Sequence, residues 1–266
     1  IQYIKKAMNK GFIESFYLYA NMLIFDNDGI PINEREGIRY MKIAAFNGSI
    51  NALGKYAGLL INGLGVEQDI QEGIKYFKEG IDKGSIVAMN DYAYMLQFGK
   101  EIEVNYEEAI KYYKILIDKG IPTAMNNYAY MLIHGDGVEV NIEEGIKLYK
   151  MAIEKGNANA MYNYGYMLQY GINIEANCEE ASKLYKMAIE KGNPNAMYEY
   201  AQMLKGKSNF IEAIKYFKMA IDKNFALAMN DYAYMLQNGE GIEINYEEAI
   251  KYYKMAIDRG VPMAMN

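Results

Sequence analysis

The residues that most often carry catalysis or metal binding are scarce in this chain of 266 residues, which has one histidine, His134, and one cysteine, Cys178. A histidine that acts as a general base needs a positioned partner, and none recurs near His134. One histidine and one cysteine cannot build the usual zinc sites. A thiol in the first turn of a helix can have a lowered pKa, but the positions equivalent to Cys178 hold apolar or aromatic residues: Ile70, Tyr106, Ile142 and Tyr246. The sequence therefore predicts no catalytic residue, no metal and no cofactor.

Two further motifs resemble parts of known sites. The Gly-x-Gly loops, such as Gly63–Gly65 and Gly135–Gly137, are not followed by Gly-Lys-Ser/Thr and do not follow a predicted strand, so they are poor phosphate cradles. The Glu-Glu pairs, such as Glu107-Glu108, recur at predicted helix starts. We therefore interpret both motifs as structural, and the chain as a protein other than an enzyme.

The elements that position these residues come from an internal repeat, which is sought first because it decides the architecture. A glycine, replaced once by asparagine, recurs at spacings of 37, 36, 36, 36, 36, 32 and 36 residues: Gly11, Gly48, Gly84, Gly120, Gly156, Gly192, Asn224 and Gly260. These positions predict repeats at approximately 12–48, 49–84, 85–120, 121–156, 157–192, 193–224 and 225–260, with partial repeats at both ends.

Each repeat predicts two helices. The first, helix A, begins near a small residue such as Ala88, and its apolar residues at 88, 89, 92, 93, 95 and 96 follow helical spacing. The second, helix B, begins after an Asx residue that precedes a glutamate by three, as Asn105 precedes Glu108, which is the pattern of an N-cap. Helix B ends at a Lys-Gly pair, with the glycine at the expected C′ position.

Two helices of this length cannot bury their apolar faces alone, but stacked copies can. The predicted fold is all-α, a right-handed α-α superhelix (solenoid) of about seven two-helix repeats in a single array over 1–266. Residues 1–11 align with 250–260, so the chain should begin inside a helix B, and polar capping repeats are missing at both ends. We expect a piece of a longer array.

These residues resemble the Sel1-like repeat, a relative of the tetratricopeptide repeat. The fourth repeat carries the pattern at Ala124, Tyr128-Ala129, Gly135-Asp136-Gly137-Val138, Asn141, Gly145, Tyr149, Ala152 and Gly156. Tyrosine mostly replaces the leucine of the family, at positions 92, 128, 164, 200 and 232, and the sixth repeat is four residues short. We expect a local change of superhelical pitch there.

The resemblance implies that helix A lines a concave face whose polar positions bind an extended peptide. By register, the implied binding residues form three rows. The first holds Asn90, Asn126, Tyr162, Tyr198 and Asn230, the second Tyr94, Tyr130, Tyr166 and Tyr234, and the third Gln97, Gln169 and Gln237.

The three rows are amide and phenol, almost free of charge. Asparagine and glutamine carry both a donor and an acceptor, and tyrosine adds rigid contact area with a polar tip. Such a groove should favour an extended neutral or mildly polar segment over an acidic tail. The alternatives are that these side chains are ordinary solvated residues, or that the superhelix itself packs against this face.

The favoured function is a scaffold or adaptor that binds a protein or peptide on the concave face, and membership of a multi-protein complex is compatible with it. Two alternatives stay open, an architectural component of a large assembly and the regulatory arm of an enzyme. The net charge of −6 without a basic cluster argues against nucleic-acid binding, and no run of about 18 apolar residues predicts a membrane span. The lone cysteine makes the cytoplasm the default location, with the endoplasmic reticulum left open because some relatives act there.

Overall fold

The structure is a computed structural model that describes residues 2–24, 32–99 and 101–261. In these ranges all regular structure is helical, which confirms the predicted all-α class. The fifteen helices are α1 (Gln2–Asn9), α2 (Ile13–Ile24), α3 (Glu34–Phe46), α4 (Ile50–Asn62), α5 (Ile70–Asp82), α6 (Ile86–Phe98), α7 (Tyr106–Asp118), α8 (Pro122–His134), α9 (Ile142–Glu154), α10 (Ala158–Tyr170), α11 (Cys178–Glu190), α12 (Pro194–Gly206), α13 (Phe210–Asp222), α14 (Ala226–Asn238) and α15 (Tyr246–Ile257).

The A helices, α2 to α14 with even numbers, begin slightly earlier than the sequence predicts. α6 starts at Ile86 rather than at Ala88, because the side chain of Ser85 caps it by accepting a hydrogen bond from the backbone N–H of Ala88 at 3.1 Å. Ser49, Asn157 and Asn193 cap their A helices in the same way. The sequence analysis missed these caps.

The predicted caps of the B helices are confirmed at five positions, where the side chain accepts from the backbone N–H three residues on: Asn33, Asp69, Asn105, Asn177 and Asn245. The expectation of an equivalent cap is wrong at Asn209. Its φ is −87°, against −140° at Asn177, because the shortened loop of the sixth repeat approaches α13 from another direction. The side-chain amide of Asn209 donates to the Glu212 carboxylate instead, at 2.9 Å.

The recurring glycine does end each B helix in a left-handed conformation, as predicted. Gly120 has a φ of +75°, and Asn224, its counterpart in the sixth repeat, has a φ of +60°. Asparagine tolerates this region better than most residues, so the substitution keeps the turn.

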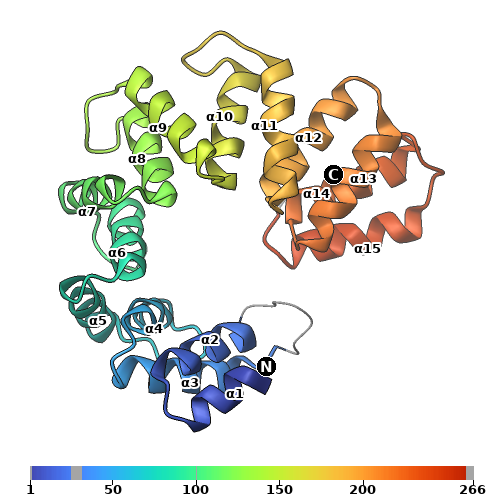
Figure 1. Ribbon diagram of the computed structural model, residues 1–266. Helices are drawn as coiled ribbons and strands as arrows, with labels where there is room; N and C mark the ends of the chain where they lie inside the picture. The colour runs from blue at the N-terminus through green and yellow to red at the C-terminus, as the bar shows by residue number, and fades with distance from the viewer. Residues whose placement is uncertain (1, 25–31, 100, 262–266) are drawn as a thin grey trace. The chain divides into compact units, whose positions relative to one another are not determined.

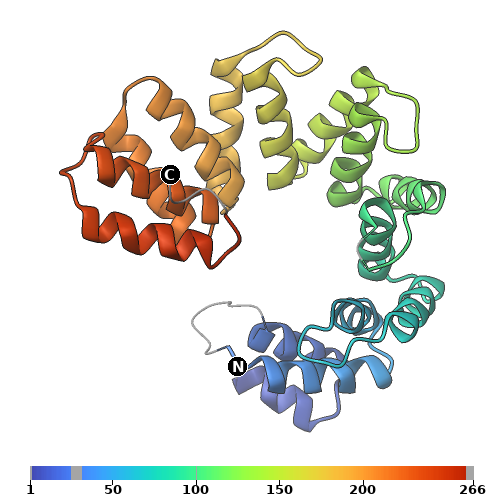
Figure 2. The same ribbon diagram turned by 180° about the vertical axis from the view of Figure 1, so that it is seen from behind.

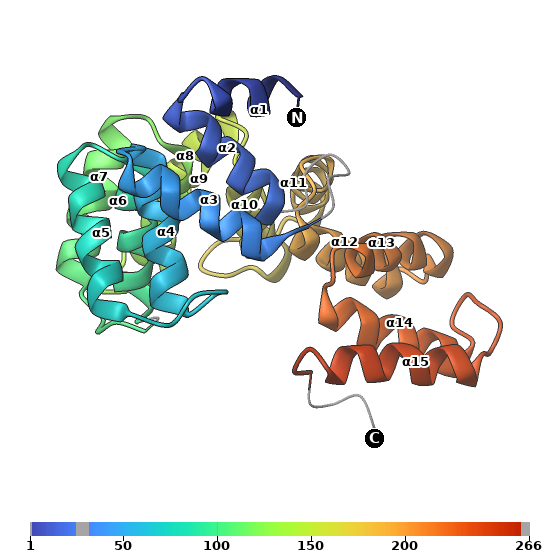
Figure 3. The same cartoon turned by 90° about the horizontal axis from the view of Figure 1, so that it is seen from below.

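The helices form two compact units, Ile1–Asn141 and Ile142–Asn266. Within the first unit, α4 and α6 lie on one side and α5 and α7 on the other (Figure 1), and the view from behind shows the same two layers (Figure 2). Within the second unit, α12 pairs with α13 and α14 pairs with α15 (Figure 3). Within each unit, an A helix therefore packs on the B helix that follows it in that unit.

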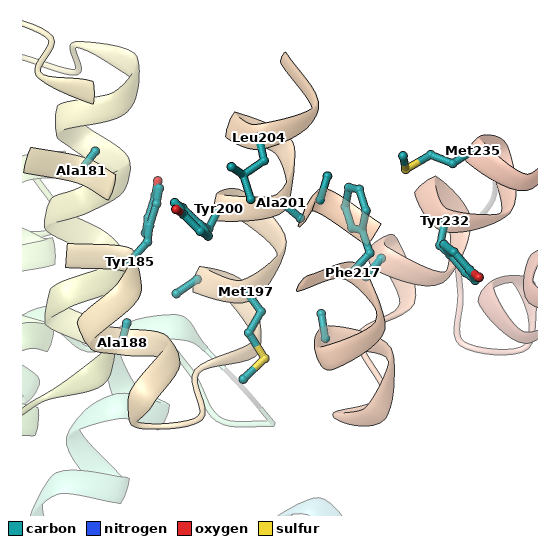
Figure 4. Close-up of a cluster of buried hydrophobic side chains, with 14 of the residues drawn as sticks. Ala181, Tyr185, Ala188, Met197, Tyr200, Ala201, Leu204, Phe217, Tyr232 and Met235 are labelled. Carbon is teal, nitrogen blue, oxygen red and sulfur yellow. The ribbon is translucent and has the colours of Figure 1, made fainter. Parts of the chain in front are cut away.

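Buried side chains of the B helices form the core between neighbouring A helices. In the first unit, Phe77 and Tyr113 are fully buried among the alanines of α4, α6 and α8. In the second, Tyr185 and Phe217 take the equivalent places, one on each side of α12 (Figure 4). Among the described helices, none has both the length and the apolar run that a bilayer span requires.

Candidate functional site

The three asparagines of the first predicted row turn toward their own helices. The side-chain N–H groups of Asn90, Asn126 and Asn230 each donate to the oxygen of the next residue, at 3.4, 3.0 and 3.2 Å. Asn126 is also buried, with 6% of its surface exposed. The side-chain oxygens of Asn90 and Asn230 are buried and lack a hydrogen-bond partner among the described residues. These amides would have to rotate before both their atoms could bond a peptide backbone.

The two tyrosines of the first row are half-buried and lie in the second unit. The ring of Tyr162 lies 6.0 Å from that of Tyr166 and 6.4 Å from that of Tyr185. The hydroxyl of Tyr198 donates to the carboxylate of Asp231 at 2.8 Å. The first row therefore joins neighbouring repeats as well as lining the surface of helix A.

The tyrosines of the second row are more accessible. Tyr94 is 37% exposed in the first unit and Tyr234 is 46% exposed in the second. Tyr130 and Tyr166 are half-buried. This row supplies most of the predicted residues that a partner could contact directly.

In the first unit the second row continues into a longer aromatic row, which we define as Tyr94, Phe98, Tyr130 and His134. Successive ring centroids lie 4.6, 6.1 and 3.9 Å apart, and the rings of Tyr130 and His134 are stacked. Sequence analysis missed Phe98 and His134 as members. Their position one helical turn after each tyrosine was the available signal.

The glutamines of the third row differ from one another. Gln97 is buried and accepts from the hydroxyl of Tyr113 at 3.0 Å, whereas Gln237 is exposed and accepts from the hydroxyl of Tyr253 at 2.9 Å. The side-chain oxygen of Gln169 is buried without a partner in the described part of the chain. Gln97 thus belongs to the core contacts between α6 and α7.

The sequence analysis assigned no role to the position directly after each residue of the first row. Side chains at this position nevertheless link neighbouring A helices. Lys55 forms an ion pair with Asp91 at 2.9 Å between α4 and α6. The hydroxyl of Tyr170 donates to Glu199 at 3.0 Å, and the amide of Gln202 donates to Asp231 at 2.6 Å. We call this position, at 55, 91, 127, 163, 199 and 231, the junction position. Its acidic members give the face more negative charge than the three rows alone predict.

The electrostatics of this face favour neutral phenols. Burial raises the pKa of Tyr162 to about 12. Burial, followed by the negative charge of Asp136, raises the pKa of Tyr130. The pKa of Glu199 is raised because the carboxyl is buried and because Asp231 adds like charge, an effect that its hydrogen bond from Tyr170 opposes. The surface therefore offers hydrogen-bond donors, acceptors and ring faces.

A hollow of about 620 Å³ lies away from these rows, beside the loops that precede α5 and α7. Gln68, Asp69, Glu101 and Glu103 line part of it, and none of the twelve predicted binding residues does. The described residues contain no group of three or more side chains placed to hold a metal ion.

Comparison with known families gives a match over most of the chain. The model of the Sel1 repeat matches residues 15–49, 50–85, 86–121, 122–157, 158–193, 194–225 and 226–261. The last six stretches lie one residue further along than the repeat boundaries that the sequence predicts. No curated protein matches the chain.

Several solved structures share this fold. A Sel1 repeat protein from Oxalobacter formigenes is 21% identical with a TM-score of 0.67, and the match covers 91% of this chain and 96% of that one. The protective antigen c5321 of uropathogenic Escherichia coli is 20% identical with a TM-score of 0.58, over 99% of this chain, which spans 57% of the length of c5321. The immunity protein Pa5087 of Pseudomonas aeruginosa is 20% identical with a TM-score of 0.55, over 70% of this chain and 68% of that one.

Proposed function

Because the chain belongs to the Sel1 repeat family, we propose that it is a protein-interaction module whose A helices bind an extended segment of a partner protein. Repeats of this type commonly mediate protein–protein interaction, and scaffolds built from them are generally non-catalytic. The partner segment contacts side chains of the A helices within one of the two compact units. The accessible second row, Tyr94, Tyr130, Tyr166 and Tyr234, supplies the main contacts.

The observation that carries this proposal is the aromatic row of the first unit. Phe98 is 43% exposed and lies between Tyr94 of its own helix and Tyr130 of the next. Exposed aromatic side chains cost free energy in water and supply much of the binding energy at protein interfaces. A row that crosses from α6 to α8 fits a segment laid across the A helices better than a single small ligand.

The other predicted binding residues contribute less to the proposed contact with the partner. Tyr162, Tyr198 and Gln169 are half-buried in the second unit, and Gln237 is exposed there. Asn90 and Asn230 contribute only when their side chains rotate. Asn126 and Gln97 are buried, and Gln97 joins α6 to α7 through Tyr113. The partner is a protein rather than a nucleic acid, since the described A helices carry carboxylates such as Asp91 and Glu199 and no basic cluster.

The experiment selects random peptides displayed on phage against the intact chain and measures their affinities by isothermal titration calorimetry. Phe98→Ala should weaken binding at least about tenfold, equivalent to about 1.4 kcal/mol. Tyr246→Ala is the matched control, because Tyr246 is 62% exposed but begins a B helix. Circular dichroism checks that both variants are folded.

Equal affinities for Phe98→Ala and the parent chain would overturn the aromatic row as the binding surface. Losses as large in Tyr246→Ala would show that the selected peptides bind B helices or recognise exposed aromatics without regard to position.

A further inference from the structure

The junction position carries opposite charges in neighbouring repeats of the first unit but like charges in the second. In the first unit, Lys55 neutralises Asp91 across α4 and α6 at 2.9 Å. In the second unit, the successive junction residues are Glu199 on α12 and Asp231 on α14, and no lysine or arginine precedes them at this position. The second unit thus repeats the acidic half of the Lys55–Asp91 pair without its basic half.

In the described part of the chain, the side chains that form hydrogen bonds with these two carboxylates are neutral donors. The hydroxyl of Tyr170 donates to Glu199 at 3.0 Å, while Tyr198 and Gln202 donate to Asp231 at 2.8 and 2.6 Å. Within the described ranges neither carboxylate forms an ion pair. Glu199 is only 9% exposed. A buried carboxylate without an opposite charge is unfavourable, because hydrogen bonds replace only part of its hydration.

A second, independent observation lies beside Glu199. Tyr113 donates its hydroxyl to Gln97 at 3.0 Å, and Tyr253 donates to Gln237 at 2.9 Å. The equivalent pair in the fifth repeat is Tyr185 and Gln169. Here both the hydroxyl and the amide oxygen are buried, and neither has a hydrogen-bond partner among the described residues.

The unpartnered hydroxyl belongs to the same cluster as the carboxylate. Tyr185 is fully buried, with its ring between α11 and α12 beside Tyr200 (Figure 4). Its pKa is raised, first by burial and then by the negative charge of Glu199. Its ring centroid lies 6.4 Å from that of Tyr162 on α10. The cluster reaches the surface at Tyr170, which is 52% exposed.

We propose that this cluster, defined as Tyr162, Gln169, Tyr170, Tyr185 and Glu199, receives the guanidinium group of an arginine from the partner protein. The proposal rests on the proposed function, because the arginine belongs to a segment bound on the A helices. The guanidinium supplies to Glu199 the positive charge that Lys55 supplies to Asp91.

Arginine fits better than lysine for two reasons. The guanidinium has five N–H donors and no acceptor, and the cluster offers the carboxylate of Glu199, the amide oxygen of Gln169 and the hydroxyl oxygen of Tyr185. A planar guanidinium also stacks on aromatic rings, and Tyr162 and Tyr170 provide them. A lysine ammonium is a compact point charge with three donors, and it has no planar face to stack on the rings.

The test is a titration of the intact chain with N-acetyl-L-argininamide, followed by the backbone amide signals in NMR spectra. The largest shifts should map to α10 and α12. Glu199→Gln should weaken binding at least about tenfold, and it keeps an acceptor for the Tyr170 hydroxyl. Asp91→Asn is the matched control, since Asp91 holds the same junction position but is already paired with Lys55, and it should leave the affinity unchanged.

Two further probes set the specificity. N-acetyl-citrullinamide has the shape of the arginine probe without its charge, and it should not bind at α10 and α12. The lysine analogue should bind more weakly than the arginine probe.

Shifts outside α10 and α12, an unchanged affinity in Glu199→Gln, or equal binding of the citrulline probe would overturn the proposal. Tighter binding of the lysine probe would overturn the assignment to arginine. This outcome is separable from the proposed function, because the arginine site can fail while phage-selected peptides still depend on Phe98.

Discussion

At the scale of single residues, the neighbour of a side chain in the next repeat decides what it does. Asp91 and Glu199 occupy the same junction position, but Asp91 contacts a lysine and Glu199 a phenol. The groups that act on Glu199 are Tyr170 and Asp231, and the negative charge of Glu199 in turn raises the pKa of Tyr162, Tyr185 and Tyr198. None of them is a cation, so the buried carboxylate is destabilising when it is ionised.

We predict that Glu199→Gln stabilises the chain at pH 7 by about 1 kcal/mol, a usual size for a stabilising substitution. The raised pKa means that the folded state binds the Glu199 proton more tightly than the unfolded state. Its contribution to stability is therefore complete below the unfolded pKa of about 4.3 and is lost as the pH rises through the folded pKa.

Urea unfolding of the parent chain and the variant across this pH range measures the effect. The stabilisation should shrink as the pH falls from the raised folded pKa of Glu199 to about 4.3, and it should be absent below that pH. A gain of equal size at every pH would contradict the assigned cause. Glu199→Ala is the control, because it removes the acceptor of the Tyr170 hydrogen bond and should not give the same gain.

Sequence alone could predict where the residues of the three proposed binding rows lie along helix A, but not how their side chains are oriented. Tyr94, Tyr130 and Tyr234 do reach the surface, as a helical register of polar residues predicts. Asn126 and Gln97 are buried, and their hydrogen bonds with Asn127 and Tyr113 offset the cost of removing the two amides from water. Register gives the position of a residue on a helix, whereas these contacts depend on how close the next helix lies.

At the scale of elements, helix ends were more predictable than helix contacts. An N-cap such as Asn177 needs only the residues that follow it, so the Asx-x-x-Glu pattern located it. The same pattern did not give a side-chain cap at Asn209, because the shorter loop before it changes its backbone angles. A contact between two A helices depends on the residues of both helices, and Gly54 on α4 is an example.

Gly54 and Gly58 lie one turn apart on α4 and face different surroundings. A Cβ atom at position 54 would lie 2.8 Å from the backbone N and Cα of Ala88 on α6, whereas one at position 58 would meet nothing within 4 Å. The first glycine therefore permits the close approach of α4 to α6. The second glycine makes no such contact, and its main effect is to make the unfolded chain more flexible.

We predict opposite effects for the two alanine substitutions. Gly58→Ala should stabilise the chain by about 0.5–1 kcal/mol, because alanine favours the helix and restricts the unfolded chain. Gly54→Ala should destabilise it by about 1–3 kcal/mol, because the backbone of α6 must move. Thermal unfolding of both variants is the measurement, and a gain at both positions would show that α4 and α6 separate without cost.

At the scale of the whole molecule, the fold class followed from the repeat, because an array of similar two-helix units buries its apolar faces only by stacking. The structure adds the division into two compact units, which the uniform spacing of the glycines does not predict. The right hand of the superhelix and the single array over 1–266 stay predictions.

The division predicts that damage in one unit stays there. Within each unit the main helix contacts join helices of the same repeat or of the next one, and stability in such arrays is close to a sum of local terms. Phe217 is fully buried in α13 of the second unit, so Phe217→Ala should cost about 3–5 kcal/mol. Hydrogen exchange followed by mass spectrometry should show faster exchange in α12 to α15, with α4 to α7 unchanged. Ile211→Ala, at an exposed position of the same helix, is the control and should not accelerate exchange in either unit. Equal acceleration in both units by Phe217→Ala would mean that the chain unfolds as one cooperative block.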